Sequence, residues 1–227
     1  MWNDFAHAFL VVFTALLPVI NPPSTALVVL SLVPDADDRQ RAGLAARIAL
    51  YGMVILTVSI LVGAYVLAFF GISIPVLRVA GGLVVAAAGW KLLQAPARVD
   101  HTAAAAVGRA SVDAVPAVSG EASLADQAFF PLTLPITVGP GSIAVAVALG
   151  TSSPSEGLRT VHFIAVLSAI ALLGLCIYTC VRYAGALSRL LGGTGTQITI
   201  RLMAFVIFCI GVEITWLGVS ELIGRTS

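Results

Sequence analysis

The chain has 227 residues, of which 59% are hydrophobic and only 10% are charged, and its mean hydropathy is +1.04. An ordinary soluble domain carries about 25% charged residues, so this composition cannot cover a water-facing surface of normal size. It argues against a soluble globular enzyme, a disordered chain and a nucleic-acid-binding protein. Twelve basic and eleven acidic residues give a net charge of +1, which indicates no electrostatic partner. The composition is typical of a polytopic membrane protein that has the lipid bilayer as its surroundings.

Three long runs, at residues 5–34, 48–77 and 127–155, contain no Asp, Glu, Lys or Arg. A helix needs about 20 apolar residues to cross a bilayer core of roughly 30 Å. Applied along the whole chain, this length predicts an all-α membrane protein with six transmembrane helices. We expect the spans at residues 5–33, 44–70, 73–94, 124–150, 159–183 and 200–223.

The basic residues predict the orientation of the chain. Nine of the twelve follow the first, third and fifth predicted spans, whereas Arg78, Arg159 and Arg225 lie on the opposite side. Cytoplasmic loops of membrane proteins are enriched in Lys and Arg. We therefore expect a bacterial-type inner (cytoplasmic) membrane protein with both termini outside.

Two of the predicted spans are interrupted by proline in the same way. A shift of 117 residues aligns the first span with the fourth, and it places Leu17 on Leu134, Pro18 on Pro135 and Pro23 on Pro140. Each half contains three spans, so the second half must enter the membrane from the opposite side. This pattern predicts a 3+3 inverted-topology repeat. The expected units are residues 1–95, a cytoplasmic linker at 96–123, and residues 124–227.

Both interruptions are expected near the bilayer midplane, where they would form a binding site. Proline lacks a backbone N–H and clashes with the preceding turn, so each break should end one half-helix and begin another. The new helix N-terminus offers unpaired N–H groups and about half a positive charge, which attracts carboxylates. Ordinary proline kinks, with their backbone groups satisfied by neighbouring helices, are the alternative. The candidate substrate-binding residues are Asn21, Pro22, Pro23, Ser24, Thr25, Thr137, Gly139, Pro140, Gly141 and Ser142.

These motifs resemble the MarC family of bacterial and archaeal inner-membrane proteins. The resemblance rests on Asn21-Pro22, on the segment 131–143 with its two prolines before Gly-Pro-Gly, and on the segment 78–82. Ser24 stands where the family commonly has glycine. The resemblance implies a secondary transporter, since some members are described as moving small neutral amino acids such as glycine and alanine.

A zwitterionic amino acid fits the predicted site, because neither break contains an acidic side chain. The carboxylate would contact the N–H groups of Ser24, Thr25, Gly141 and Ser142. The ammonium group would contact Asn21, Thr137 and carbonyl groups freed at the breaks. No metal or cofactor is predicted.

Glu213 lies inside the sixth predicted span, where a charge costs at least a few kcal/mol. It is a candidate for coupling to a proton or a sodium ion. Hydration near the interface, or pairing with a helix dipole, would explain it equally well.

Two other functions remain open at this stage. A channel or an efflux protein for other small solutes is possible on the same scaffold. A membrane-embedded enzyme or redox conduit is least expected, because Cys176, Cys180 and Cys209 form no Cys-x-x-Cys pair and no nucleophile–base motif occurs. We therefore expect a protein that is not an enzyme, with homo-oligomerisation left open.

Overall fold

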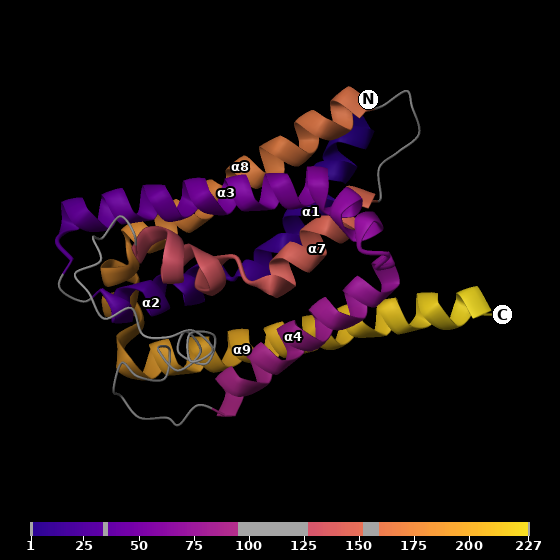
Figure 1. The fold of residues 1–227 in the computed structure, drawn as a ribbon. Helices are drawn as coiled ribbons and strands as arrows, with labels where there is room; N and C mark the ends of the chain where they lie inside the picture. The colour runs from indigo at the N-terminus through magenta and orange to yellow at the C-terminus, as the bar shows by residue number, and fades with distance from the viewer. Residues whose placement is uncertain (1, 34–35, 95–126, 152–158, 227) are drawn as a thin grey trace.

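The computed structural model describes residues 2–33, 36–94, 127–151 and 159–226, and all regular structure in these residues is helical (Figure 1). The elements are α1 (Trp2–Ile20), α2 (Pro22–Leu32), α3 (Asp38–Phe69), α4 (Ile74–Gln94), η1 (Ala128–Thr137), α7 (Pro140–Thr151), α8 (Arg159–Arg182) and α9 (Ala184–Thr226). The prediction of an all-α membrane protein is confirmed at this level.

Within the described residues, five segments are long and apolar enough to cross a membrane: Trp2–Leu30, Asp38–Phe69, Ile74–Lys91, Thr160–Arg182 and Arg201–Gly224. They coincide with five of the six predicted spans. The remaining predicted span, 124–150, consists of two short helices, η1 and α7, and its first residues lie outside the described ones. The predicted linker at 96–123 also lies outside the described residues.

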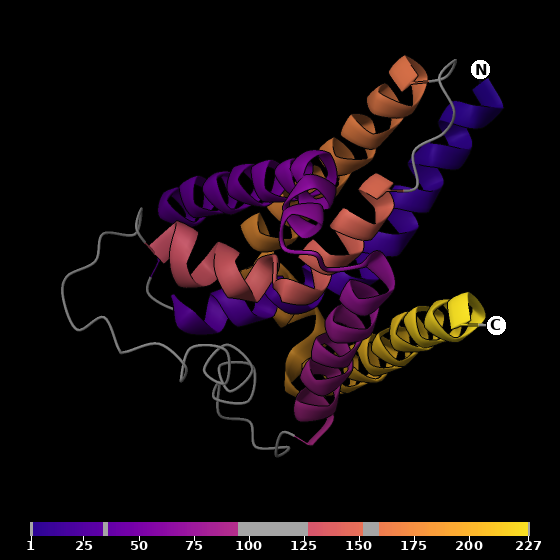
Figure 2. The same cartoon turned by 45° about the vertical axis from the view of Figure 1, so that its right-hand side comes forward.

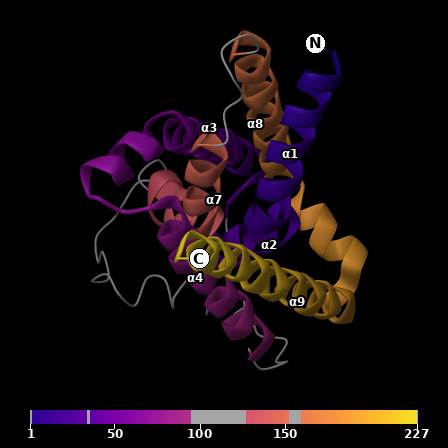
Figure 3. The ribbon, with the colours of Figure 1, turned by 90° about the vertical axis from the view of Figure 1, so that its right-hand side faces the viewer.

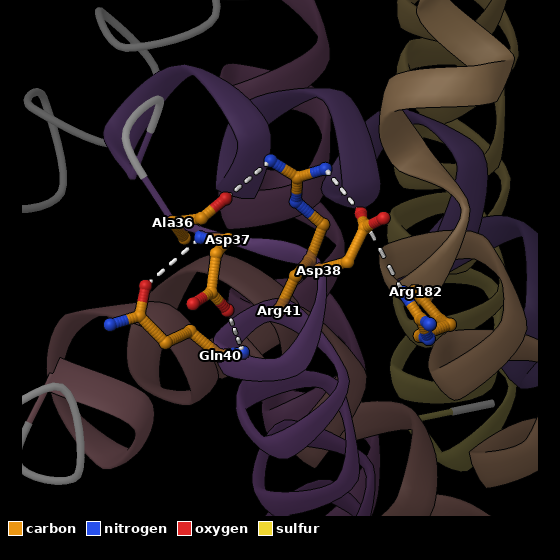
Figure 4. A network of polar contacts seen from close by, with 6 residues as sticks. All are labelled: Ala36, Asp37, Asp38, Gln40, Arg41 and Arg182. Carbon is orange, nitrogen blue, oxygen red and sulfur yellow. Dashed lines mark hydrogen bonds and ion pairs between the residues drawn. The ribbon is translucent and has the colours of Figure 1, made fainter.

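Two helices extend beyond the predicted spans because their polar turns also form helix. Helix α3 begins six residues before the predicted span, where Asp37 forms a capping box (Figure 4). The Gln40 N–H donates to Asp37 Oδ1 at 2.6 Å, and the Asp37 N–H donates to Gln40 Oε1 at 2.9 Å. Helix α9 begins at Ala184 and is kinked at Gly192, whose φ of 63° favours glycine. Uncharged runs thus mark the apolar part of a helix and miss its polar ends.

The main hydrophobic core is formed by α1, α2, α3, η1, α7 and α8. Among the side chains that the structure describes, its buried cluster contains members from each of these elements, none from α4, and only Ala184 from α9. Helices α4 and α9 instead lie side by side along one flank of this core (Figures 2 and 3). Helix α4 reaches the core through α7, and α9 reaches it through α1, α2 and α8.

The two flanking helices approach closely through glycines. A Cβ atom at Gly89 would lie 2.5 Å from the Phe208 backbone nitrogen, and one at Gly211 would lie 2.2 Å from that of Ala86. Close backbone contact between small residues is a common means of helix association in membranes. Contacts pair higher residue numbers in α4 with lower ones in α9, so the helices are antiparallel. We call them the α4–α9 pair.

The two ends of the bundle differ in their polar residues. Both termini lie at one end (Figures 1 and 3). The opposite end carries the network of Figure 4, in which Arg41 Nη2 donates to the Ala36 carbonyl at 3.0 Å. Arg41 and Arg182 each lie 3.9 Å from Asp38 Oδ1, which links the start of α3 to the end of α8. Because the Asp38 side chain is 86% exposed, these ion pairs contribute little stability.

Candidate functional site

Both interrupted helices break at the centre of the bundle. The first break lies at Asn21, between α1 and α2, and the second lies at Val138 and Gly139, between η1 and α7. Figures 1 and 2 show the two breaks in the middle of the molecule, with α2 and α7 running away from them toward opposite ends. Helix α1 contacts α7 and α2 contacts η1, so the broken segments pack against each other.

The first break satisfies its own backbone. Asn21 adopts a left-handed conformation with φ 48°, and Pro22 and Pro23 occupy the first two helical positions, where a missing N–H does no harm. The Ser24 N–H donates to Asn21 Oδ1 at 3.4 Å, and the Thr25 N–H donates to the Asn21 carbonyl at 3.0 Å. The start of α2 therefore has neither of the N–H donors that were expected to bind a carboxylate.

The side chain of Asn21 retains a donor that has no partner. The residue is only 5% exposed, and its Nδ2 makes no hydrogen bond within the described part of the chain. A buried polar group left unsatisfied costs about 1–3 kcal/mol. Such groups are rare in native proteins, and a ligand or a water molecule that accepts the hydrogen bond commonly explains them. Asn21 was expected to accept from an ammonium group, but its Oδ1 is used by the cap and its amide is the free donor.

The second break is preceded by an irregular, π-helical segment. Phe130 (φ −127°, ψ 125°) and Leu134 (φ −104°, ψ 125°) have extended backbones inside η1. Each precedes a proline, Pro131 or Pro135, whose ring disfavours the helical region for the residue before it. The two prolines therefore distort the chain before the break itself begins.

Two threonines compensate for part of this distortion. Thr133 Oγ1 donates to the Ala128 carbonyl at 2.6 Å, and Thr137 Oγ1 donates to the Leu132 carbonyl at 2.7 Å. Both threonines are almost completely buried, at 0% and 2% exposure. Their hydroxyl oxygens keep lone pairs that can accept a hydrogen bond.

The start of α7 differs from the start of α2 in its free donors. The Ile143 N–H donates to the Gly139 carbonyl at 3.1 Å, but the N–H groups of Gly141 and Ser142 have no partner among the described residues. Gly141 is buried against α4, where a Cβ atom would lie 2.1 Å from Val85 Cγ2. Only glycine brings the backbone this close to α4. These N–H groups, at the positive end of the helix dipole, suit an anionic group.

The buried polar residues gather in the broken segments. Ser59 of α3 is the one described buried polar residue outside them, and none of the buried set is charged. The others are Asn21, Ser24, Thr25, Thr133, Thr137 and Ser142. The centre of the molecule is thus polar but uncharged, with donors from both halves of the chain.

Comparison with known proteins identifies the family. A family model described as "MarC family integral membrane protein" matches residues 6–223. This chain belongs to the MarC family.

Curated MarC relatives cover nearly the whole chain. It is 34% identical over 215 residues to the inner membrane protein MarC of Salmonella paratyphi B and to that of Salmonella typhimurium, covering 92% of each chain. It is 31% identical to that of Escherichia coli O139:H28 over the same length and coverage. The resemblance seen in the sequence is confirmed, and the apolar helices suit the inner membrane location in the relatives' names. No solved structure matches the chain.

The remaining predicted site residues of this MarC protein occupy varied positions. Pro22 is buried, Pro23 and Gly139 are half-buried, and Pro140 is exposed at the first turn of α7. Glu213 is exposed on α9, apart from both breaks, so its role in ion coupling stays a prediction.

Sequence reasoning missed two contributors to the site. Thr133 belongs to a tandem pattern, Phe-Pro-Leu-Thr followed by Leu-Pro-Ile-Thr, and this repetition was a visible signal. Val85, which packs on Gly141, carries no sequence signal, because the contact joins helices far apart in the chain.

Proposed function

We propose that this MarC-family protein is a secondary transporter of small neutral amino acids such as glycine and alanine, working by alternating access. The observation that carries the proposal is the pair of helix breaks at the centre of the bundle. They hold unpartnered donors at Asn21 Nδ2 and at the N–H groups of Gly141 and Ser142. Broken helices that meet near the bilayer midplane are typical of substrate sites in transporters.

The chemistry of the breaks favours a small zwitterion. The substrate carboxylate would accept from Gly141 and Ser142 at the start of α7 and from the Asn21 amide. The ammonium group would donate to the hydroxyl oxygen of Thr137 and to nearby carbonyl groups. A neutral amino acid needs no compensating charge from the protein, and the buried polar residues that the structure describes are all uncharged.

The packing of the helices supports six spans arranged as a 3+3 inverted repeat. Helix α8 packs on α1 and α2, and its counterpart α3 packs on η1 and α7. Helix α4 packs on α7, and its counterpart α9 packs on α2. These contacts of one half therefore have equivalents in the other, as expected for two halves related by a two-fold axis in the membrane plane.

The position of the basic residues in the fold supports the proposed orientation in the membrane. Arg39, Arg41 and Arg47 at the start of α3, Lys91 near the end of α4 and Arg182 at the end of α8 lie at the end of the bundle opposite the termini. The positive-inside rule makes that end cytoplasmic and puts both termini outside.

Uptake of labelled glycine or alanine into proteoliposomes, followed with and without an imposed proton or sodium gradient, tests this function. We expect saturable uptake and accumulation against the substrate gradient. A channel on the same scaffold would equilibrate the substrate and never concentrate it, and lack of any glycine or alanine uptake would contradict the proposal.

The site assignment is tested by Asn21→Asp, with Asn3→Asp on the exposed start of α1 as the matched control. Asp keeps the oxygen that caps Ser24 but replaces the free donor by an acceptor that repels a carboxylate. We expect the KM for glycine to rise at least about tenfold, because the variant loses one hydrogen bond to a charged group and this bond contributes about 1.5–3 kcal/mol. The same KM in both variants would rule out Asn21 as a substrate ligand.

A further inference from the structure

A cavity of about 690 Å³ separates part of the core from the α4–α9 pair. It lies in the half of the molecule that is nearer to both termini, the end seen in Figure 3. Its wall includes Ala15 and Pro18 from α1, Ala144 and Ala148 from α7, Leu217 from α9, and Arg78 from α4. A volume of roughly 300–1,000 Å³ with a mainly apolar wall and a few polar groups is typical of sites for small molecules.

The inner part of the cavity lies beside both helix breaks. Pro18 precedes Asn21 by three residues, and Ala144 follows Ser142 by two. With a rise of about 1.5 Å per residue, Pro18 lies about 5 Å from Asn21 along α1, and Ala144 lies about 8 Å from Gly139 along α7. The cavity therefore leads from the end of the molecule that bears the termini toward the proposed binding site.

The outer part of the cavity carries two charged side chains. Arg78 Nη1 donates to Glu221 Oε2 at 2.5 Å, and the two side chains are 29% and 35% exposed. Arg78 has five N–H donors, and those beyond Nη1 have no partner among the described residues. Charged groups in this position require water nearby, which favours a wet cavity over one filled by lipid chains.

We propose that this cavity is the water-filled outer vestibule of the transport path and that Arg78 is the first contact in it for a small substrate bearing a free carboxylate. The role of the cavity in transport rests on the proposed function. The access of water to the cavity and the electrostatic effect of Arg78 do not rest on it, because both can be measured without substrate.

The accessibility test uses a full-length protein in which Cys176, Cys180 and Cys209 are replaced by Ala. Single cysteines are then placed on α7 by Ala148→Cys, in the cavity wall, or by Ala146→Cys, which is the matched control in the core with 0% exposure. Cells or right-side-out vesicles are treated with the membrane-impermeant cation MTSET (trimethylammonioethyl methanethiosulfonate). Because thiol reactivity follows exposure, we expect Ala148→Cys to react at least about tenfold faster than Ala146→Cys.

The electrostatic test compares MTSET with the anionic reagent MTSES (sulfonatoethyl methanethiosulfonate) on Ala148→Cys at low ionic strength. A unit charge that acts in water over about 10 Å changes the reaction rate of a charged reagent about twofold. Its removal shifts the rates of the anionic and the cationic reagent in opposite directions. We expect Arg78→Gln to lower the MTSES-to-MTSET rate ratio about fourfold, and Glu221→Gln to raise it. A role limited to pairing α4 with α9 would give the two variants the same effect.

Three other outcomes would contradict the inference, each in a distinct way. Reaction of Ala148→Cys only with a lipophilic maleimide would show a lipid-filled cleft, and reaction only in inverted vesicles would place the cavity on the cytoplasmic side. Equal rates for both cysteines would mean that the cavity is closed to water. A wet cavity in a protein that moves no amino acid would overturn the proposed function and leave the water-filled cavity standing.

Discussion

Asn21 shows how one side chain can form a break and leave a donor for a ligand. Its left-handed backbone ends α1, its oxygen caps α2, and its amide stays buried without a partner in the described structure. Asparagine is one of the few residues that tolerate this backbone conformation without strain. A bound acceptor would remove the penalty of the buried donor.

The close packing of Gly141 against Val85 at the second break can be tested by substitution. Gly141→Ala places a Cβ 2.1 Å from Val85 Cγ2, and we expect overpacking to lower stability by about 1–3 kcal/mol. Adding Val85→Ala removes the clashing methyl group, so the double variant should be more stable than the sum of the single effects predicts. Thermal unfolding in mild detergent measures all three variants. Strict additivity would mean that the two residues do not touch.

At the scale of elements, η1 is the least regular of the described helices, and hydroxyl groups support it. Its prolines cannot donate to the preceding turn, and the residues before them are extended. Threonine hydroxyls instead reach carbonyls five residues earlier, and Thr25 makes the equivalent bond to Ile20 at 2.9 Å in the first broken segment. The two broken segments therefore use the same side-chain chemistry.

Thr133→Val should destabilise the protein by about 1–2 kcal/mol, because it removes a fully buried hydrogen bond without changing the shape of the side chain. The control is Thr179→Val in the last turn of α8, where the hydroxyl donates to the Leu175 carbonyl at an exposed position, so its loss leaves no buried group unsatisfied. The unfolding midpoints of the two variants in detergent measure this difference in stability. Equal shifts in the two variants would contradict a supporting role for Thr133.

At the scale of the whole molecule, packing separates the α4–α9 pair from the core of six other elements. The two helices of the pair pack tightly on each other, and the cavity lies between the pair and the core. In the proposed inverted repeat, α4 belongs to the first half and α9 to the second. Alternating access would then move a body that contains one helix from each repeat, rather than one whole repeat against the other.

Gly211→Ala tests how tightly this body is held together. A Cβ there would lie 2.2 Å from the backbone nitrogen of Ala86, and backbone cannot move aside as a side chain does, so we expect a loss of at least about 2 kcal/mol. Gly43→Ala on α3 is the matched control, since a Cβ there meets nothing within 4 Å. The control should gain up to about 1 kcal/mol from helix propensity. Comparable unfolding temperatures would contradict close contact in the α4–α9 pair.

Much of this architecture was predictable from local sequence. Apolar runs located five spans, because a bilayer imposes a minimum apolar length on any helix that crosses it. Prolines located both breaks, because the missing N–H and the ring act within one turn of the chain. The polar character of the breaks was also readable, since their serines, threonines and asparagine lie next to those prolines.

Tertiary structure decided which groups at the breaks are free. The expected donors Ser24 and Thr25 bond to Asn21, whose backbone and rotamer place the accepting oxygens. The N–H groups of Gly141 and Ser142 have no partner among the described residues. The contact of Gly141 with Val85, the α4–α9 pair and the cavity beside the breaks all join residues distant in sequence. Hydropathy and proline spacing act locally and carry no information on such contacts. The shortage of charge thus identified a membrane protein with two broken helices, and packing determined where its unpaired donors and its cavity lie.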